Sequence, residues 1–342
     1  MKPELSVIVA AFNCEKTIMA CLEAIRQSKS VVYELIVVDD GSHDNTCQRA
    51  GKYADTIVRH PRNIGRFEAR MTGMRHAEGA LVVNVDADVL IRHDSLRLIR
   101  DYFKAHPEIN AVTGLLSKEH PHPDYFSQYK NLYMHYCFRK LPDQVSFLYG
   151  SIFAIRRDAI DFSGVSVRVA DDTELGQMLV SPGKRIGMLK ELEVIHLKRF
   201  DFGSWLINDF RIPHDWARIF VKYQGWKKMV QSKRGFAHAS MGQIVSMILA
   251  VLIFLGLVST AIYPVCVPGL TGFLAFIWVM LNRDFLRYLR VERGVTFAVA
   301  GLFVTFMDHL VMMVGVITGV CSLIYAPIGS KTTRGALYRD KT

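Results

Sequence analysis

The sequence has few cysteines, and none is spaced for a disulfide or a metal site. There are six cysteines in 342 residues, with no C-x-x-C pair among them. Cys14 and Cys21 are two helical turns apart, about 10 Å if they share one helix, which is too far for a disulfide. We therefore expect free thiols in a reducing compartment.

The chain is also short of acidic residues. It carries 32 Asp and Glu against 42 Lys and Arg, which gives a formal net charge of +10. Nucleic acid is a common partner of basic proteins, but here the basic residues gather beside apolar runs, where they favour a membrane surface. These residues are Lys222, Lys227, Lys228, Lys233, Arg234, Arg283, Arg287, Arg290 and Arg293. We expect no nucleic-acid binding.

Long apolar runs are missing from the first 240 residues and dominate the remainder. The runs are Ile244–Tyr263, Val265–Leu281 and Thr296–Tyr325, each near or above the ~20 residues that a helix needs to cross a bilayer. The early run Leu5–Phe12 is too short and too soon followed by polar residues to be a signal peptide. We predict a multi-pass membrane protein.

Orientation follows from the basic residues that flank the runs, because such residues mark the cytoplasmic side. The N-terminal half is therefore expected in the cytoplasm. The third run contains Asp308 and His309, an ionisable pair that is costly in lipid, and it fits either one tilted helix or a broken pair. A single third span conflicts with the rule that basic residues lie on the cytoplasmic side, since it places four of them outside: Lys331, Arg334, Arg339 and Lys341.

The first 200 residues alternate short apolar segments with helix-like ones. Strands are expected at 5–11, 34–38, 56–58, 80–85, 111–116, 146–156 and 185–196, and helices at 15–26, 44–54, 66–77, 94–105, 125–139 and 173–179. This alternation implies crossover connections and a largely parallel sheet, hence an α/β fold. In such sheets ligands bind beyond the carboxyl ends of the strands.

We expect four regions along the chain: an α/β domain at 1–200, amphipathic interfacial helices at 201–240, transmembrane helices at 241–326 and a basic tail at 327–342. The transmembrane region holds three apolar spans, or four if the third run is broken. The helix expected at Trp205–Lys228 mixes aromatic and basic residues. Such a helix suits a membrane interface, and packing against the first domain is equally compatible.

Three acidic segments stand out. Asp39-Asp40-Gly41-Ser42 and Asp86-Ala87-Asp88 end expected strands, and Asp171-Asp172-Thr173-Glu174 begins an expected helix. Mg²⁺ and Mn²⁺ prefer oxygen ligands, commonly one or two carboxylates together with phosphate oxygens. Each segment alone also has a plain structural explanation: a turn, a polar strand end and a helix cap, respectively.

In order and spacing, these segments resemble the family-two inverting glycosyltransferases of GT-A fold. The matching segments are Ser6–Asn13, Ile36–Ser42, Asn63–Gly65 with Ala69-Arg70, Val85–Asp88, Gly150–Arg157 and Asp171–Leu175. The resemblance implies a GT-A domain, Rossmann-like with a mostly parallel sheet, followed by an α-helical membrane region. It also implies inverting, metal-dependent transfer of a single sugar from a UDP- or GDP-linked donor to a lipid-linked or membrane-proximal acceptor.

The resemblance further implies roles for individual residues. The general base that deprotonates the acceptor would be Asp172, and Asp88 and His196 would bind Mg²⁺ or Mn²⁺. The nucleotide-sugar would contact Ala10, Phe12, Asn13, Asp39, Asp40, Arg70, Asp86, Ala87, Asp88, Asp171 and Lys198. Displacement at an anomeric carbon needs such a base and a cation at the leaving group. For His196 a structural role, and for Lys198 a solvated charge, are equally compatible with the sequence.

The chain departs from the family pattern at three positions: Ala10 stands in place of proline, Cys14 of glutamate and Asp171 of glutamate. Processive members carry a Q-x-x-R-W motif near the membrane, and Ile212–Trp216 keeps only its tryptophan. Single transfer is therefore favoured over the alternative, a processive polysaccharide synthase. A nucleotidyltransferase is disfavoured because no glycine-rich, arginine-containing loop follows Leu5–Ala11. A membrane adaptor with an inactive fold would tend to lose the acidic residues, which are all present.

Overall fold

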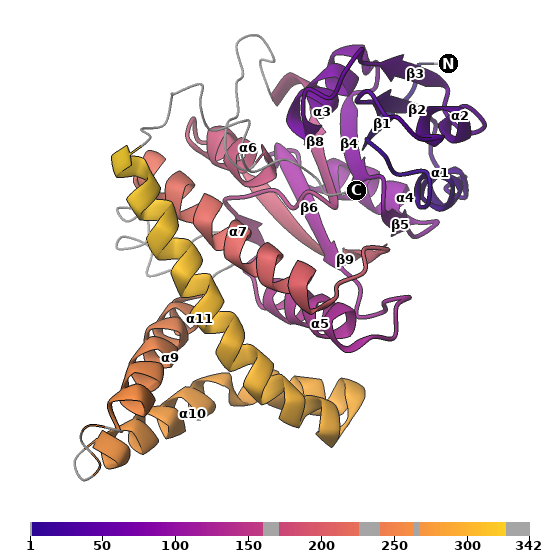
Figure 1. Cartoon of the computed structure of the whole chain (residues 1–342). Helices are drawn as coiled ribbons and strands as arrows, with labels where there is room; N and C mark the ends of the chain where they lie inside the picture. The colour runs from indigo at the N-terminus through magenta and orange to yellow at the C-terminus, as the bar shows by residue number, and fades with distance from the viewer. Residues whose placement is uncertain are drawn as a thin grey trace. The chain divides into compact units, whose positions relative to one another are not determined.

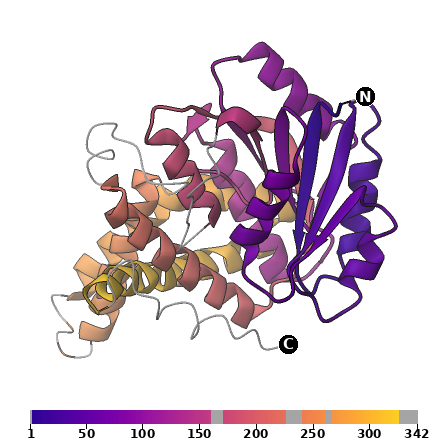
Figure 2. The same cartoon turned by 90° about the horizontal axis from the view of Figure 1, so that it is seen from above.

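The computed structural model describes residues 2–159, 171–225 and 240–325, apart from 261, 263, 265 and 266. The chain divides into two compact units, Met1–Asp201 and Phe202–Thr342, and each is described by itself (Figures 1 and 2). The expected basic tail and part of the expected interfacial region, residues 226–239, lie outside the described residues.

The first unit is built on one mixed sheet of nine strands. They are β1 (Leu5–Ala11), β2 (Tyr33–Asp39), β3 (Thr56–Arg59), β4 (Leu81–Asp86), β5 (Val89–Ile91), β6 (Ala111–Leu116), β7 (Gln144–Val145), β8 (Ile152–Arg156) and β9 (Ile186–His196). Their order is β3-β2-β1-β4-β8-β6-β9-β5, with β7 paired to β9. The first four strands are parallel, whereas β8 is antiparallel to both β4 and β6.

The strand order reverses at β1, because β2 and β3 lie on one side of it and β4 on the other. Right-handed crossovers then place α1 (Ile18–Arg26) and α3 (Arg66–His76) on opposite faces of the sheet. The register pairs Ala11 with Asp39 and Ala10 with Asp86. The carboxyl ends of β1, β2 and β4 therefore lie at one edge, where open α/β sheets bind their ligands.

The remaining helices of this unit are α2 (Thr46–Ala50), α4 (Ser95–Ala105), α5 (Tyr125–Arg139) and α6 (Asp171–Val180). A buried apolar cluster joins α3 and α6 to the sheet, with Met71, Leu175, Ile8, Ile36 and Phe153 among its members. The even-numbered apolar residues of β1 and β2 face this cluster, as the two-residue repeat of a strand requires.

The expected α/β fold is confirmed, with local differences. The expected strand at 146–156 begins only at Ile152, because the preceding residues turn through the edge described above. Strands β5 and β7 were not expected, since three and two residues are too few to show a periodicity. The helix expected at 44–54 is reduced to Thr46–Ala50.

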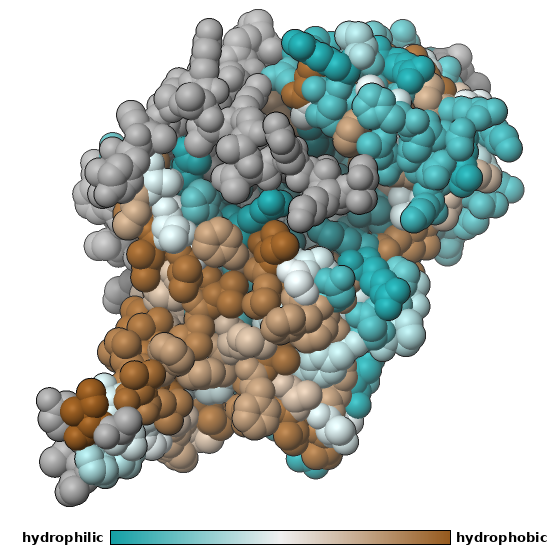
Figure 3. Space-filling model, viewed as in Figure 1, coloured by the Kyte–Doolittle hydropathy of each residue, from teal (hydrophilic) through white to brown (hydrophobic). Residues whose placement is uncertain are grey.

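The second unit contains α7 (Phe202–Lys222), α9 (Met241–Ser259), α10 (Val267–Arg293) and α11 (Val295–Tyr325). Among the described residues, three helices are long and apolar enough to cross a bilayer: Met241–Ser259, Val267–Arg293 and Val295–Leu323. Their exposed surface is largely apolar, the brown area of Figure 3. The third apolar run is thus one unbroken helix.

Helix α7 packs along the C-terminal half of α11 (Figure 1). Two glycines of α11 allow this approach: a Cβ at Gly315 would collide with the carbonyl oxygen of Phe210, and one at Gly319 with that of His214. Small residues four apart commonly let helix backbones approach in this way. The aromatic helix expected at a membrane interface or against the first domain therefore pairs, within its own unit, with the last apolar helix.

A buried polar junction joins the three apolar helices. Trp278 Nε1 donates to His309 Nδ1 at 3.1 Å, and Asn282 Nδ2 donates to Ser246 Oγ at 3.2 Å. These bonds connect α10 to α11 and to α9. The histidine that the sequence placed at a costly position in lipid thus has a partner, as buried polar groups require.

The glycine contact gives a first prediction. Gly319→Ala adds a Cβ that pushes α7 and α11 apart, which should cost about 1–3 kcal/mol and lower the midpoint of thermal unfolding in detergent. Gly272→Ala is the matched control, since nothing lies within 4 Å of its added Cβ. Alanine favours helix over glycine by up to ~1 kcal/mol, so the control should melt at or above the wild-type midpoint. Equal midpoints for both variants would contradict the packing.

Candidate functional site

Four chain segments meet at the edge where β1, β2 and β4 end. Residues 10–13 include the end of β1, residues 39–42 begin at the last residue of β2, and residues 86–88 begin at the last residue of β4. The fourth segment is the start of α6, where Asp172 Oδ2 accepts a hydrogen bond from the N–H of Gly150 at 2.8 Å. Side chains from across the first unit are brought together here by strand register.

Asp39 is fully buried at the end of β2. Its Oδ1 accepts from the N–H of Ser42 at 3.0 Å, and its Oδ2 lies 3.2 Å from Arg59 Nε, an ion-pair distance without hydrogen-bond alignment. Beside it is a pocket of about 390 Å³, lined by Gly41, Ser42, His43, Arg59, His60 and Pro61. This volume lies within the range of small-ligand pockets.

Asp40 serves the neighbouring loop. Its Oδ1 lies 2.7 Å from His60 Nδ1 and accepts from the N–H of Ile64 at 3.1 Å. Its Oδ2 accepts from the N–H of Gly65 at 2.8 Å, directly before α3. The carboxylate therefore fixes residues 60–65 and the start of α3.

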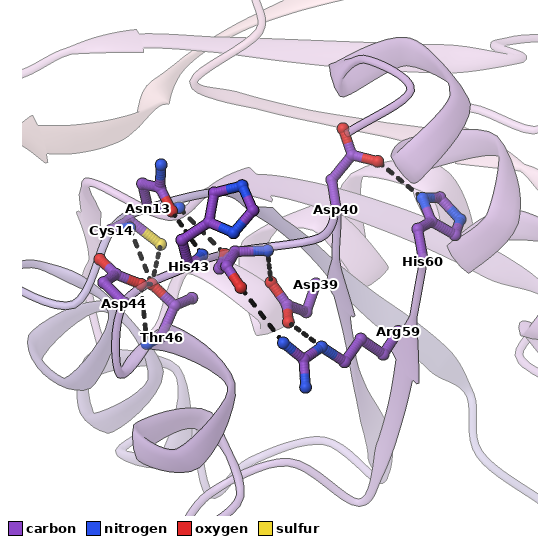
Figure 4. A network of polar contacts seen from close by, with 10 residues as sticks. Asn13, Cys14, Asp39, Asp40, His43, Asp44, Thr46, Arg59 and His60 are labelled. Carbon is purple, nitrogen blue, oxygen red and sulfur yellow. Dashed lines mark hydrogen bonds and ion pairs between the residues drawn. The ribbon is translucent and has the colours of Figure 1, made fainter. Parts of the chain in front are cut away.

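The loops after β1 and β2 are bound to one another (Figure 4). The N–H of Asn13 donates to Ser42 Oγ at 3.0 Å, and its Oδ1 accepts from the N–H of His43 at 2.9 Å. The ring of Phe12 meets His43 edge-on, with centroids 6.4 Å apart. Gly41 has φ +76°, and a Cβ there would lie 2.6 Å from the backbone of Arg62. Only glycine fits this turn without strain.

Arg70 connects two of the acidic segments. Its Nη2 lies 2.6 Å from Asp86 Oδ1 and donates to the carbonyl of Gly150 at 3.0 Å. Gly150 in turn donates to Asp172, whose Oδ1 accepts from the N–H of Thr173 at 2.7 Å. A Cβ on Gly150 would lie 2.7 Å from Asp172 Oδ2. The series Asp86, Arg70, Gly150 and Asp172 is thus one contiguous polar network.

Asp88 meets His196 because β5 pairs with β9, which sets Val89 opposite His196. The closest approach is 3.4 Å, from His196 Nε2 to Asp88 Oδ2. Burial opposes ionisation of Asp88, but the hydrogen bond and charge of His196, together with the charge of Lys198, outweigh it and hold the pKa of Asp88 below its ordinary value. Asp88 is therefore an anion at neutral pH.

Lys198 follows two residues later, with its ammonium 4.8 Å from the ring centroid of Phe200. Loss of hydration around the ammonium lowers the pKa of Lys198, and the positive charges of Arg66 and Lys130 lower it further, whereas Asp88 and Asp86 act in the opposite direction. Cations and carboxylates are thus concentrated at this end of the site, an arrangement suited to a phosphate and a metal ion.

No group of three or more His, Cys, Asp or Glu side chains that could hold a metal is present in the part of the chain that the structure describes. Asp88 and His196 nevertheless supply an oxygen and a nitrogen donor side by side. Mg²⁺ characteristically keeps several waters and takes one or two carboxylates plus substrate phosphates. The donor set therefore fits a divalent cation that arrives with a phosphorylated ligand.

The residues expected at the site from the sequence are mostly gathered here. Ala10 pairs in register with Asp86, and Ala87 is buried between the two aspartates. Asp171 is the first residue of α6, and its side chain lies outside the described residues.

Two contributors were missed, Arg59 and Tyr149, and Gly150 was matched to the family pattern without a role of its own. Arg59 was detectable in principle, because β3 sets it directly opposite Asp39. Tyr149 is partly buried. Loss of hydration raises the pKa of its hydroxyl, and the negative charges of Asp86, Asp172 and Asp88 raise it further. No periodic signal marks an irregular segment such as Tyr149-Gly150.

Comparison with known proteins agrees with this geometry. Residues 6–163 match the family model for glycosyl transferase family 2. An undecaprenyl-phosphate 4-deoxy-4-formamido-L-arabinose transferase of Proteus mirabilis is 36% identical over 95 residues, 25% of this chain and 29% of that protein. An N-acetylglucosaminyltransferase of Azorhizobium caulinodans is 32% identical over 124 residues, 34% of this chain and 31% of that protein. The chain thus spans about three-tenths of these relatives.

Among solved structures, a mannosyltransferase from Pyrobaculum calidifontis in complex with GDP-Man and Mn²⁺ is similar with a TM-score of 0.57. The sequence identity is 16%, and the match covers 94% of this chain and 88% of that one. The fold and its strand-end acidic site define a GT-A domain. The match of residues 6–163 to glycosyl transferase family 2 agrees with the resemblance found in the sequence.

Replacing Asp40 tests its role in fixing the loop before α3. Asp40→Ala removes the acceptor for the N–H groups of Ile64 and Gly65. A hydrogen bond to a charged group typically contributes about 1.5–3 kcal/mol, so the midpoint of thermal unfolding should fall clearly. Asp101→Ala, at a half-exposed surface aspartate that pairs with Arg100, is the control and should change the midpoint little, since surface ion pairs contribute at most ~1 kcal/mol. A wild-type midpoint for Asp40→Ala would refute the loop-fixing role.

Proposed function

We propose that this protein transfers a single sugar, with inversion, from a UDP- or GDP-linked donor to a lipid or lipid-linked acceptor at the membrane. The observation that carries the proposal is the convergence of Asp39, Asp86, Asp88 and Asp172 at one edge of a GT-A sheet. A nucleotide-sugar presents a base, a diphosphate and a reacting carbon in line, and each of these needs a different partner.

The base end of the donor is assigned to Asp39. Its carboxylate contacts Ser42 and Arg59, which line the adjacent pocket. A buried acceptor oxygen beside an arginine complements a ring that offers N–H next to C=O, as both uracil and guanine do. Asn13 and Phe12 contact the pocket residues Ser42 and His43, and we assign them to the nucleoside as well.

The diphosphate end is assigned to Asp88, His196 and Lys198. Asp88 and His196 would hold Mg²⁺ or Mn²⁺, which, when bound, stabilises the negative charge of the departing nucleoside diphosphate. Lys198 adds a cation on the same segment. Asp86 is held by Arg70, so it is oriented towards the donor as a fixed acceptor, suited to a ribose or sugar hydroxyl.

Asp172 is assigned as the general base. Gly150 N–H donates to one of its oxygens and Thr173 N–H to the other. Donors to both oxygens favour the ionised carboxylate and fix its direction. A carboxylate has about four lone-pair sites, so it can still accept the proton of an acceptor hydroxyl or acid. Attack from that side, opposite to the leaving group, inverts the anomeric centre.

The acceptor is assigned to the membrane because of the second unit. Three of its helices are long and apolar enough to cross a bilayer, and a relative of the first unit is named for an undecaprenyl-phosphate substrate. We place the catalytic unit at the cytoplasmic face, since the basic residues that precede α9 and end α10 favour that side. The protein would then be a multi-pass membrane enzyme.

The assignment of the base is tested with Asp172→Asn, which keeps the shape of the side chain but cannot accept the proton. We expect sugar transfer to fall at least ~10²-fold, since general bases typically contribute 10²–10⁴-fold. Binding of the nucleoside diphosphate should stay unchanged. Transfer is measured with radiolabelled UDP- and GDP-sugars and polyprenyl phosphate in nanodiscs.

The matched control is Asp158→Asn, an exposed aspartate just after β8, which should transfer at the wild-type rate. Full turnover by Asp172→Asn would exclude this residue as the base. The size of the product distinguishes the alternative mode of action: one added sugar supports single transfer, and a growing chain would show a processive synthase.

A further inference from the structure

The segment after β9, residues 197–200, carries Lys198, directly follows His196, and belongs to no strand. It is held instead by a loop, residues 117–124, that precedes α5. Two histidines of this loop point at consecutive backbone carbonyls: His122 Nε2 lies 3.0 Å from the carbonyl oxygen of Leu197, and His120 Nε2 lies 3.1 Å from that of Lys198. Nothing in the proposed chemistry uses either imidazole.

The protonation of both rings follows from these partners. A carbonyl oxygen only accepts, so each Nε2 must carry the hydrogen. The Nδ1 of His120 lies 3.3 Å from the backbone nitrogen and 3.4 Å from the carbonyl oxygen of His122, so it contacts the backbone of that residue in either protonation state. Burial lowers the pKa of His120, which favours the neutral ring at pH 7.

The loop itself is anchored to α5. Gln128 Nε2 donates to the carbonyls of His120 and His122, at 3.2 and 2.7 Å. Asn131 Nδ2, one turn along the helix, donates to the carbonyl of Ser117 at 2.8 Å. The two imidazoles are therefore not free rotors on a surface loop. They are donors of fixed direction, because side chains of α5 hold the loop that carries them.

The opposite side of the segment is fixed as well. The N–H of Leu197 donates to the carbonyl of Asp88 at 2.8 Å, and the N–H of Phe200 donates to Ser127 Oγ at 2.7 Å. Leu197 is thus bonded to Asp88 through its N–H and to His122 through its carbonyl. Lys198 is the next residue, and its backbone is placed between the two histidines and the aspartate.

This placement matters because of the charges around it. Asp86 and Asp88 attract the ammonium of Lys198, whereas Arg66 and Lys130 repel it. Coulomb energies in a partly desolvated site change steeply with distance, so a shift of the backbone at Leu197-Lys198 would change how these groups present themselves to a diphosphate. Partners that orient ligand-bearing residues in this way are known to affect affinity without touching the ligand.

We propose that His120 and His122 are positioning residues that hold His196 and Lys198 against Asp88, and so set the affinity of the site for a diphosphate with its divalent cation. This rests on the proposed function, because it takes the diphosphate end as assigned there. The base pocket is lined by residues 41–43 and 59–61, whereas His120 and His122 contact the backbone of Lys198 and Leu197. The two ends of the ligand should therefore respond separately.

The test compares asparagine and glutamine at the same position. A glutamine amide nitrogen reaches about as far as Nε2 of histidine, whereas an asparagine amide nitrogen reaches only as far as Nδ1. His122→Asn therefore loses the bond to Leu197, and His122→Gln keeps it. Both substitutions are polar and small, so neither removes an apolar core group. The same pair at His120 is the second variant set.

Binding of UDP, UMP, GDP and GMP is measured by calorimetry on the full-length protein in detergent with Mn²⁺. For whichever base binds, His122→Asn should weaken the diphosphate about 10-fold, as loss of orienting partners typically does. The monophosphate should bind as it does to wild type, which also shows that the variant is folded. His122→Gln should restore the diphosphate affinity, and His93→Gln, at an exposed histidine before α4, should have no effect.

Three outcomes overturn the proposal. Unchanged diphosphate affinity in His122→Asn and His120→Asn would show that the contacts position nothing. Equal losses for mono- and diphosphate would show general loosening of the site. Failure of glutamine to restore affinity would exclude the Nε2 bond as the cause. Wild-type protein that binds no nucleotide at all would instead refute the proposed function itself, which distinguishes the two failures.

Discussion

The site depends on one buried ion pair, between Arg70 and Asp86 at 2.6 Å. Arg70 comes from α3 and Asp86 from the end of β4, and the same guanidinium bonds the carbonyl of Gly150, whose N–H holds Asp172. A buried charge that loses its partner costs about 3–5 kcal/mol. The pair therefore connects Asp86, on the proposed donor side of the site, to Asp172, the proposed base. Because Arg70 lies on α3, the positions of both carboxylates depend on the packing of α3 against the sheet.

The remaining acidic residues have different structural roles, which follow from the groups that each one contacts. Both carboxylate oxygens of Asp40 accept hydrogen bonds from the loop before α3, whereas its neighbour Asp39 contacts the pocket residues Ser42 and Arg59. Asp88 depends on β9, because its partner His196 arrives through antiparallel pairing with β5. Adjacent residues of one motif thus differ in role: Asp40 fixes a loop of the site, and Asp39 contacts residues that line the pocket.

Much of this arrangement was predictable from the sequence. The buried runs of β1, β2 and β4 gave the parallel edge, and the position of Asp39 and Asp86 directly after such runs placed them together. What could not be predicted depends on long-range pairing. The loop at His120 and His122 has no periodicity, and only the fold brings it to Leu197. Likewise, the sequence of α11 does not show why it carries glycines at these positions, because the reason is the close approach of α7.

The central claim is that this edge of the sheet binds a nucleoside diphosphate together with a divalent cation. Thermal unfolding of the purified protein tests it most directly. The panel contains UDP, GDP, ADP and CDP, each with Mn²⁺, with Mg²⁺ and with EDTA. A specific ligand at one hundred times its Kd stabilises the folded state by ~2.7 kcal/mol. We predict a rise in midpoint with UDP or GDP that requires the cation. No rise with any nucleotide, with or without metal, would contradict the account.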